Sequence, residues 1–192
     1  MRAIGNDNID WDKHWEEHKS DPNFTDPKAF DYFIDLLPKN FRVLELGCGI
    51  GKWAEAFLRA GASEYVGVDF SAIAIEEARR RYAGKPCKFL LMRAEEMDFD
   101  NEFDLVFTHT FLQHTTIITK RRLLPKIWKA LRPSGLLVIQ EKCDVFTPTT
   151  FTRDGWVRFI TAFGFEFLRM TPEGDPRNGF VFRKESEWKV IK

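Results

Sequence analysis

The sequence predicts an α/β fold in which a doubly wound, mostly parallel sheet carries helices on both faces. Short apolar segments of strand length, such as Arg42–Leu46 and Tyr65–Val68, alternate with amphipathic segments of helix length. A glycine-rich turn follows the first of these strands. Strands that alternate with helices need right-handed crossovers, which produce a parallel sheet that binds ligands at the carboxyl ends of its strands.

The chain before the first strand is expected to form a helical cap on the core. In a single domain of 192 residues, residues 1–40 would be this cap or lid and residues 41–192 the core. Asp10 can cap a first helix, and Pro27 suits the first position of a second helix. One face of the first helix carries large rings at helical spacing, namely Trp11, His14, Trp15 and His18.

The core elements follow from the apolar spacing and from the turn residues between them. The expected strands are 42–46, 65–68, 88–92, 104–108, 136–140, 166–170 and 180–183. The expected helices are 51–62, 71–83, one that buries Leu124 to Leu131 with an irregular start at Pro125, and 152–163.

Composition and charge exclude several classes of partner and compartment. Lys plus Arg equals Asp plus Glu at 29 each, so the chain offers no basic footprint for nucleic acid. Three cysteines in no metal-binding spacing, with a polar amino-terminal segment unlike a signal peptide, favour free thiols in a reducing compartment. No apolar run approaches the ~20 residues that span a membrane. We therefore expect a cytoplasmic protein.

The loop after the first strand is the strongest candidate for a cofactor site. Gly47, Gly49 and Gly51 allow a sharp turn and a close approach of the backbone to a ligand. A dinucleotide needs G-x-G-x-x-G, but Lys52 stands where that pattern has its third glycine. Glu45 is awkward beside a pyrophosphate and suits a cationic amino-acid sulfonium. The loop therefore favours a sulfonium nucleoside over NAD.

Two residues after the second strand extend this site. Asp69 ends that strand, where a carboxylate can accept both ribose hydroxyls, and Phe70 is placed to stack on adenine. A plain tight turn with surface caps would be the simpler explanation. However, Glu45, the glycines and Asp69 share one strand–loop–helix–strand unit, as a nucleoside-binding fingerprint requires.

With these blocks in place, residues 41–140 resemble the class I, Rossmann-like S-adenosylmethionine-dependent methyltransferases, in particular their small-molecule branch (type 11/12-like). Five blocks carry the resemblance in order: Val43–Gly51, Val66–Ser71, Ala94–Met97, Phe103–Val106 with Leu112–His114, and Leu131–Ile139.

The resemblance implies a seven-stranded sheet of order 3-2-1-4-5-7-6 with strand 7 antiparallel, and S-adenosylmethionine as cofactor, with S-adenosylhomocysteine as product. It places Asp69 on the ribose and the backbone of Ala94 and Thr108 on the adenine and the methionine amino group. Arg93 stands where the family often has an adenine-binding Asp, and since Arg has no acceptor, Glu95 could replace it. The expected cofactor-binding residues are Glu45, Gly47, Cys48, Gly49, Asp69, Phe70, Ala94, Glu95 and Thr108.

Candidates for the methyl-transfer step follow the fourth strand. Methyl transfer from a sulfonium needs the nucleophile held in line, and it needs a general base only if the acceptor must lose a proton early. His109 and His114 are the candidate catalytic residues, with helix packing as the competing role for His114. The loop 141–144 also points to this region, with Cys143 expected as a small buried hydrophobe. We expect no metal, because His14 and His18 lack further ligands nearby.

The sequence therefore predicts an S-adenosylmethionine-dependent methyltransferase that acts on a small molecule. The alternatives are a protein N-terminal methyltransferase, an NAD-dependent oxidoreductase and a non-catalytic cofactor-binding module. Lys142 stands near the position of an Asn typical of the N-terminal methyltransferases, which counts against them. Oligomeric state and the identity of the acceptor are not encoded in any motif.

Overall fold

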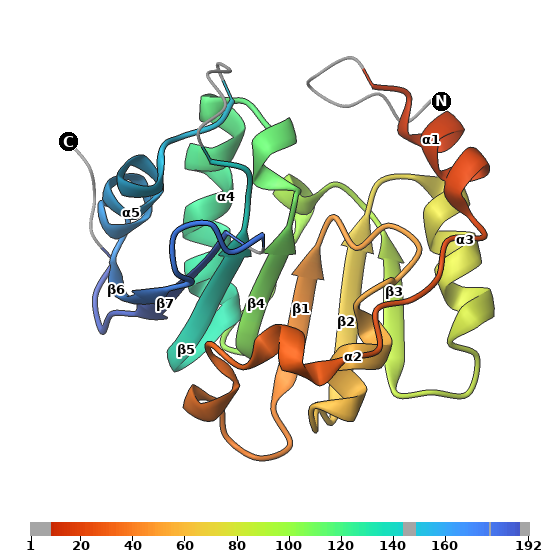
Figure 1. The fold of residues 1–192 in the computed structure, drawn as a ribbon, viewed down its shortest axis with the longest axis horizontal. Helices are drawn as coiled ribbons and strands as arrows, with labels where there is room; N and C mark the ends of the chain where they lie inside the picture. Colours follow the sequence, from red (N-terminus) through yellow and green to blue (C-terminus); the bar gives the residue numbers. More distant parts are fainter. Residues whose placement is uncertain (1–8, 144–148, 177, 189–192) are drawn as a thin grey trace.

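The computed structural model describes residues 9–143, 149–176 and 178–188, which form a seven-stranded sheet with helices on both faces (Figure 1). The strand order is β3-β2-β1-β4-β5-β7-β6. Strands β1 to β5 pair in parallel, and β7 pairs antiparallel with both β5 and β6. This confirms the expected doubly wound fold and its strand order.

The elements have the following bounds. The strands are β1 Arg42–Leu46, β2 Glu64–Asp69, β3 Cys87–Leu91, β4 Phe103–His109, β5 Leu131–Gln140, β6 Phe165–Met170 and β7 Gly179–Lys184. The helices are α1 Trp11–His18, α2 Ala54–Arg59, α3 Ala72–Arg81, α4 Ile117–Ala130 and α5 Arg153–Thr161. Four short 3-10 turns are η1 Pro27–Phe30, η2 Ile34–Leu36, η3 Ala94–Glu96 and η4 Leu112–His114.

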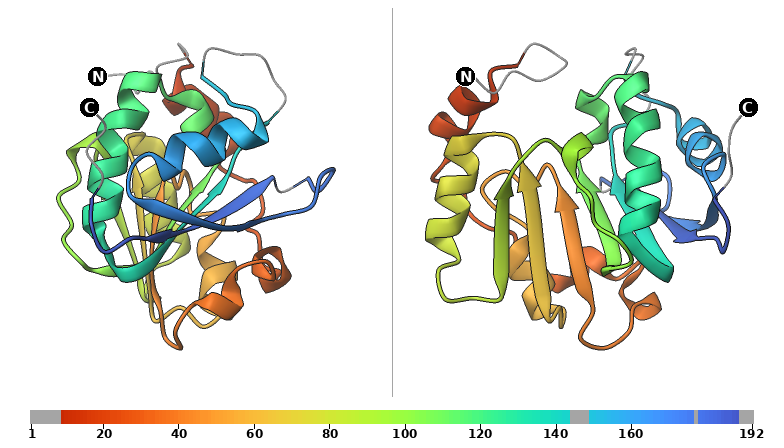
Figure 2. Two further views of the ribbon diagram at one scale, coloured as in Figure 1. Left: turned by 90° about the vertical axis from the view of Figure 1, so that its left-hand side faces the viewer. Right: turned by 180° about the vertical axis from the view of Figure 1, so that it is seen from behind.

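The sheet separates two hydrophobic layers, because neighbouring side chains of each strand point to opposite faces. In β1, Leu44 and Leu46 join the layer under α4 and α5, whereas Val43 joins the layer under α2 and α3. Figure 1 shows α2 in front of the sheet, and the reverse view in Figure 2 shows α4 in front of it. Both faces of the central strands are therefore buried.

Three helices differ from the sequence prediction. The segment from Pro27 forms the two 3-10 turns η1 and η2 instead of a regular helix. The burial of Phe30 and Phe33 against the core stabilises this conformation more than the hydrogen bonds of a regular helix would. The glycine loop runs on as a turn, so α2 begins only at Ala54. Pro125 lies inside α4, which starts at Ile117 after the capping side chain of Thr116 accepts from the backbone N–H of Thr119.

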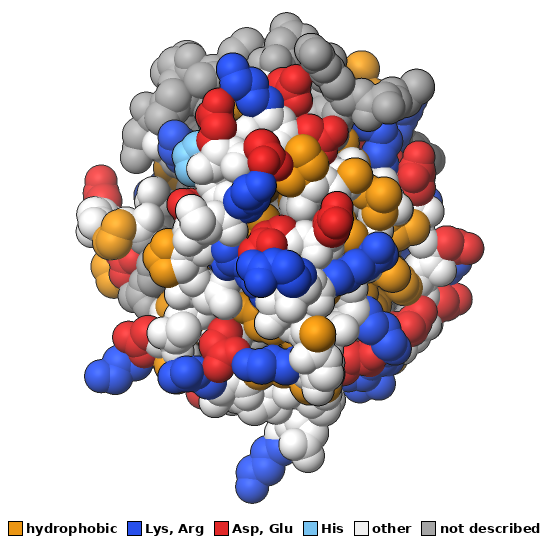
Figure 3. Space-filling view, turned by 90° about the vertical axis from the view of Figure 1, so that its right-hand side faces the viewer, with side chains coloured by type: hydrophobic (Ala, Val, Ile, Leu, Met, Phe, Trp, Pro, Cys, Tyr) orange, Lys and Arg blue, Asp and Glu red, His pale blue; other side chains and the backbone are white. Residues whose placement is uncertain are grey.

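The surface over α3 and β3 carries both signs of charge in a mixed pattern. Figure 3 views the molecule from this side, and there basic and acidic side chains alternate without a single-sign patch. On α3, Glu77 pairs with Arg80 and Arg81, and Arg79 donates to the carbonyl of Phe89. Among the described residues, no helix has the length and apolar character to cross a membrane.

Candidate functional site

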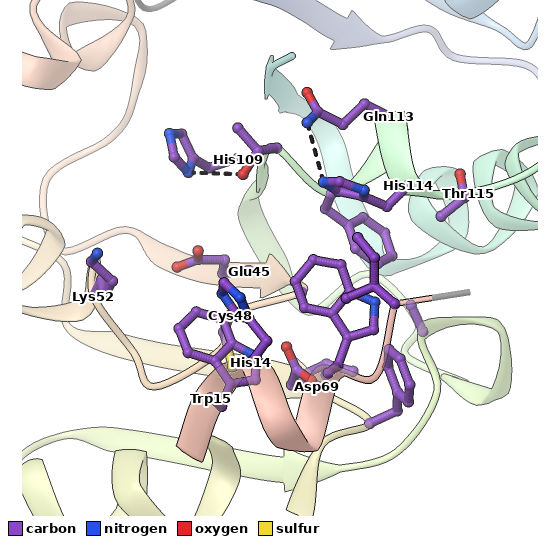
Figure 4. Close-up of a pocket in the computed structure, with 18 of the residues that line it drawn as sticks. His14, Trp15, Glu45, Cys48, Lys52, Asp69, His109, Gln113, His114 and Thr115 are labelled. Carbon is purple, nitrogen blue, oxygen red and sulfur yellow. Dashed lines mark hydrogen bonds between the residues drawn. The ribbon is translucent and has the colours of Figure 1, made fainter. Parts of the chain in front are cut away.

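A cavity of roughly 510 Å³ opens at the carboxyl ends of β1, β2 and β4, under α1. A ligand is expected here in a parallel fold. The two strands beside β1, namely β2 and β4, lead through their loops to helices on opposite faces of the sheet. Figure 4 shows its labelled side chains. Asp69 lies at one end and Lys52 and His109 lie at the other, with Glu45 and Trp15 between them.

The glycine loop forms the floor of this cavity. Gly47 and Gly49 have φ of +70° and +52°, a left-handed conformation that side chains with a Cβ seldom adopt. The backbone N–H groups of Gly47 and Cys48 donate to the carbonyl of Val68 at 2.8 and 3.1 Å. The loop is thus tied to the end of β2, which places it directly beside Asp69.

The carboxylate of Asp69 is held by two backbone amides. It accepts from the N–H of Gly49 at 2.9 Å and from the N–H of Ser71 at 2.9 Å. Burial raises the pKa of Asp69, and the hydrogen bonds from Ser71 and Gly49 oppose that rise. Each carboxylate oxygen has a second lone pair, so Asp69 can still accept hydroxyl donors from a ligand in the cavity.

Next to Asp69, a cation lies on an aromatic ring at the cavity wall. The guanidinium of Arg93 lies 5.0 Å from the centre of the Phe70 ring, a cation–π distance. Ala94 and Glu95 line the same wall, and Ala94 begins the η3 turn. Arg93 therefore contacts the ring that is expected to stack on adenine. We call Asp69, Phe70, Ala94 and Glu95 the nucleoside end.

Glu45 is a buried carboxyl group at the centre of the cavity. It is only 2% exposed, and the hydroxyl of Tyr65 donates to it at 2.5 Å. Burial raises the pKa of Glu45 to about 8, against the opposing effect of the Tyr65 hydrogen bond. A neighbouring positive charge would stabilise its ionised form.

Two aromatic rings cover the glycines. A Cβ at Gly49 would collide with the ring of Trp15, and a Cβ at Gly47 would collide with the ring of Phe111. Trp15 comes from α1, which the bond from the Ser71 hydroxyl to Asp12 (2.7 Å) fastens to the start of α3. The glycines thus make room for rings, and a ligand that lies on Gly49 has to displace Trp15.

The opposite end of the cavity combines aromatic rings with one lysine. The rings of Phe24 and Trp53 are 4.2 Å apart and tilted by 31°, and the ring of His109 lies 5.1 Å from Trp53. The Lys52 ammonium lies 5.1 Å from the centre of the Phe24 ring. We call these four residues, Phe24, Lys52, Trp53 and His109, the acceptor end.

His109 is a neutral ring in this environment. Burial, together with the nearby Lys52, lowers its pKa to about 4. A group with that pKa is a weak general base near neutral pH. The residue after it, Thr110, has φ of +50°, a strained conformation for a β-branched residue, and this turn directs the chain across the cavity.

His114 is oriented by its neighbour Gln113. The Gln113 carbonyl oxygen accepts from the backbone N–H of Lys142 at 3.0 Å, so the amide nitrogen of Gln113 faces His114 Nε2 at 3.1 Å. An amide nitrogen only donates, so His114 Nε2 accepts and the proton of the neutral ring lies on Nδ1. Trp11 also packs edge-on against the His114 ring.

Glu141 is a residue of the site that no motif indicated. Its buried carboxylate accepts from the Thr108 hydroxyl and from the backbone N–H groups of Phe111, Leu112 and Gln113, at 2.9 to 3.2 Å. Burial raises its pKa to about 7, and these four hydrogen bonds oppose the rise. Glu141 therefore fixes the η4 turn that carries His114. In the sequence, what could have indicated Glu141 is its position directly after a predicted parallel strand.

The structure brings most of the predicted site residues together. The cavity is lined by Glu45, Gly47, Cys48, Asp69, Phe70, Ala94, Glu95, His109 and His114. Thr108 is fully buried behind the wall, and Gly49 lies under Trp15. Cys143 is buried, as expected, whereas Asp144 lies outside the described residues. Within the described ranges, no three His, Cys, Asp or Glu side chains gather as a metal site.

Comparison with known proteins places the chain among methyltransferases. Residues 43–135 match the family described as "Methyltransferase domain". The chain is 33% identical over 137 residues to a ubiquinone biosynthesis O-methyltransferase of Bradyrhizobium sp. (strain ORS 278), covering 69% of this chain and 49% of the relative. It is 33% identical over 124 residues to demethylmenaquinone methyltransferase of Clavibacter sepedonicus, covering 63% and 48%. The chain thus spans about half the length of these curated relatives.

Solved structures share the fold at low sequence identity. A protein from Pyrococcus horikoshii OT3 superposes with a TM-score of 0.71 at 18% identity, covering 88% of this chain and 99% of that one. The 1,6-didemethyltoxoflavin-N1-methyltransferase of Burkholderia thailandensis superposes with a TM-score of 0.68 at 20% identity, covering 83% and 77%. That structure holds 1,6-didemethyltoxoflavin and S-adenosylhomocysteine.

Proposed function

Because residues 43–135 of this chain form a methyltransferase domain of the class I, Rossmann-like family, we propose that it transfers a methyl group from S-adenosylmethionine to a small molecule. One observation carries the proposal. Asp69 lies at the carboxyl end of β2 within the cavity, and the amides of the glycine loop and of Ser71 hold its carboxylate.

The nucleoside end fits the expected cofactor. Asp69 offers free lone pairs for ribose hydroxyls, and Phe70 offers an aromatic face beside the backbone of Ala94. When bound, S-adenosylmethionine supplies a methyl group on a positively charged sulfur. A cationic ligand would stabilise the ionised form of the buried Glu45 carboxyl, whereas a pyrophosphate would destabilise that form. The fit at the other end of the loop requires the Trp15 ring to move from Gly49.

The residues of the cavity would act mainly by positioning. Glu141 fixes the η4 turn, and Gln113 orients the ring of His114, which lines the cavity. The His109 ring, with a pKa of about 4, contributes an uncharged surface. In-line alignment of the acceptor with the methyl group is then the main contribution to rate.

Two further observations support a small acceptor inside a cell. The named relatives include demethylmenaquinone methyltransferase, and a similar fold binds 1,6-didemethyltoxoflavin. The cavity of about 510 Å³ has the size of a small-molecule site. All three cysteines are free thiols, which is consistent with the proposed cytoplasmic location.

Calorimetric titration tests the proposal. We expect S-adenosylmethionine and S-adenosylhomocysteine to bind, and we expect no heat from NAD at the same concentrations. Tight NAD binding together with no response to either sulfur ligand would overturn the proposal. Screening of metabolites with a methyl-labelled cofactor would then identify the acceptor.

A further inference from the structure

The acceptor end carries an aromatic wall that nothing in the cofactor assignment uses. Phe24 is a large apolar side chain with 38% of its surface exposed, although its ring packs on that of Trp53. The His109 ring completes the wall, 6.1 Å from Phe24 and 5.1 Å from Trp53. Aromatic rings that line a cavity favour a planar ligand, since stacked and edge-on contacts each add to the burial of apolar area.

The same wall carries a positive charge. The Lys52 ammonium lies over the Phe24 ring, and Lys52 and His109 line the same cavity. In Figure 4, Lys52 and His109 lie together at the end of the cavity away from Asp69. A ligand that stacks on Phe24 would therefore bring its edge near the ammonium.

Lys52 has a partner that a ligand can replace. Its ammonium lies 3.2 Å from the Asp21 carboxylate, and the two side chains are 24% and 37% exposed. An ion pair between partly exposed side chains contributes little, because water screens the charges. Asp21 also lines the cavity, in the segment that joins α1 to Phe24. An anionic group on the ligand can therefore compete with Asp21 for Lys52 at small cost.

Lys52 is the only charged residue among the four of the acceptor end, and the Asp21 carboxylate beside it is the anion that a ligand would replace. His109 is neutral at physiological pH because its pKa is lowered to about 4. The acidic groups Glu45 and Asp69 line the cavity away from this wall, in its centre and at its nucleoside end. An anion at the Phe24 wall would therefore take the place of Asp21 beside Lys52, an exchange that a neutral ligand of the same shape cannot make.

From this geometry we infer that the methyl acceptor is a planar ring compound carrying an anionic oxygen, a carboxylate or a phenolate, which pairs with Lys52 while the ring stacks against Phe24 and Trp53. The inference rests on the proposed function, since it takes the rest of the cavity for the cofactor. It assigns Lys52 as the residue that selects the acceptor by charge.

The test compares two probes of equal shape and different charge. Benzoate and benzamide are titrated into the full chain saturated with S-adenosylhomocysteine, with binding followed by saturation-transfer NMR. We expect benzoate to bind at least tenfold more tightly than benzamide. A second arm titrates 4-nitrophenol above and below its own pKa, so that a preference for its ionised form distinguishes a phenolate site from a carboxylate site.

Three variants assign the preference to Lys52. Lys52→Met should remove the preference for benzoate, and Lys52→Arg should retain most of it because the charge is kept. Lys129→Met is the matched control, since Lys129 is an exposed lysine paired with Asp98 at the opposite end of the sheet. This control should leave the preference unchanged.

The outcomes separate this inference from the proposed function. If S-adenosylhomocysteine binds but benzoate and benzamide bind equally, or if Lys52→Met keeps the preference for benzoate, the inference is wrong and the proposed function stands. If S-adenosylhomocysteine does not bind the wild-type chain, both fail. Retained binding of S-adenosylhomocysteine by Lys52→Met shows that this variant is folded.

Discussion

The two ends of the cavity are built in different ways. The nucleoside end is made within one stretch of chain, where backbone amides of the glycine loop and of Ser71 hold Asp69. The acceptor end is made from side chains of three separate segments, since Phe24, Lys52 and His109 lie far apart in the sequence. An end held by backbone geometry is suited to a constant ligand, whereas an end made of side chains can change its ligand by substitution.

The largest expected effect is a loss of stability when the η4 turn loses its contact with Glu141. Glu141→Ala leaves the buried N–H groups of Leu112 and Gln113 and the partly buried N–H of Phe111 without their acceptor. We expect the free energy of unfolding in urea to fall by about 3 kcal/mol, because each buried donor left unpaired costs roughly 1–3 kcal/mol. Glu141→Gln keeps one carbonyl oxygen and should lose less. Equal and small losses in both variants would show that the turn does not depend on Glu141.

The next effect concerns the pH dependence of stability, through Glu45 at the centre of the cavity. Its pKa in the folded protein is about 8, raised by burial from 4.5. A raised acid pKa contributes stability below pH 4.5 that is lost as the pH rises towards 8. We expect Glu45→Gln to remove this loss, which amounts to roughly 1.4 kcal/mol for each pH unit between the two pKa values.

Glu77→Gln serves as the control for this pH series. Arginines 80 and 81 lower the pKa of Glu77 to about 2, so its contribution is lost as the pH falls, not as it rises. Urea unfolding between pH 5 and 8 should therefore show the same slope for Glu77→Gln as for the wild-type chain. If Glu45→Gln also shows the wild-type slope, Glu45 is already ionised in the folded protein.

A substitution at each end tests whether the two ends are independent. Asp69→Ala should weaken S-adenosylhomocysteine binding at least tenfold, about 1.4 kcal/mol, because the ribose loses its acceptor. Lys52→Met should leave that affinity within twofold. Calorimetry measures both, with Asp69→Asn as an intermediate case that keeps one oxygen. An unchanged dissociation constant for Asp69→Ala would falsify the ribose assignment.

The smallest effect concerns the ring that covers Gly49. Trp15→Ala removes the side chain that a ligand on this glycine has to displace. We expect S-adenosylhomocysteine to bind about threefold more tightly, a gain of roughly 0.6 kcal/mol. Trp11→Ala, on the same face of α1 but packed on His114, should not show this gain. Weaker binding by Trp15→Ala would mean that the ring covers the ligand instead of competing with it.

The sequence predicted the nucleoside end far better than the acceptor end, for a physical reason. Asp69 and the glycines act through local backbone geometry, which a short motif specifies. Lys52 drew attention only as a departure from the dinucleotide pattern, because its partners Phe24 and Asp21 reach it through tertiary packing. Likewise, nothing local indicates that Glu141 caps a turn almost thirty residues earlier.

The secondary structure could likewise be predicted where local patterns determine it and was predicted wrongly where tertiary packing does. The strands and their order could be predicted, because continuous apolar runs are typical of a sheet buried on both faces. The segment from Pro27 has helical spacing, yet burial of Phe30 and Phe33 under the sheet favours short 3-10 turns. The start of α4 at Ile117 was missed because Pro125 was interpreted as a boundary, although Thr116 caps the helix two turns earlier.

The placement of the tryptophans has a practical consequence. Trp11, Trp15 and Trp53 line the cavity, which is half of the six in the chain. Indole emission responds to the polarity and contacts around each ring, so the protein carries intrinsic fluorescent reporters within its own site. Occupation of the cavity should therefore be visible in the unlabelled protein, and single Trp→Phe replacements would show which of the three rings a given compound contacts.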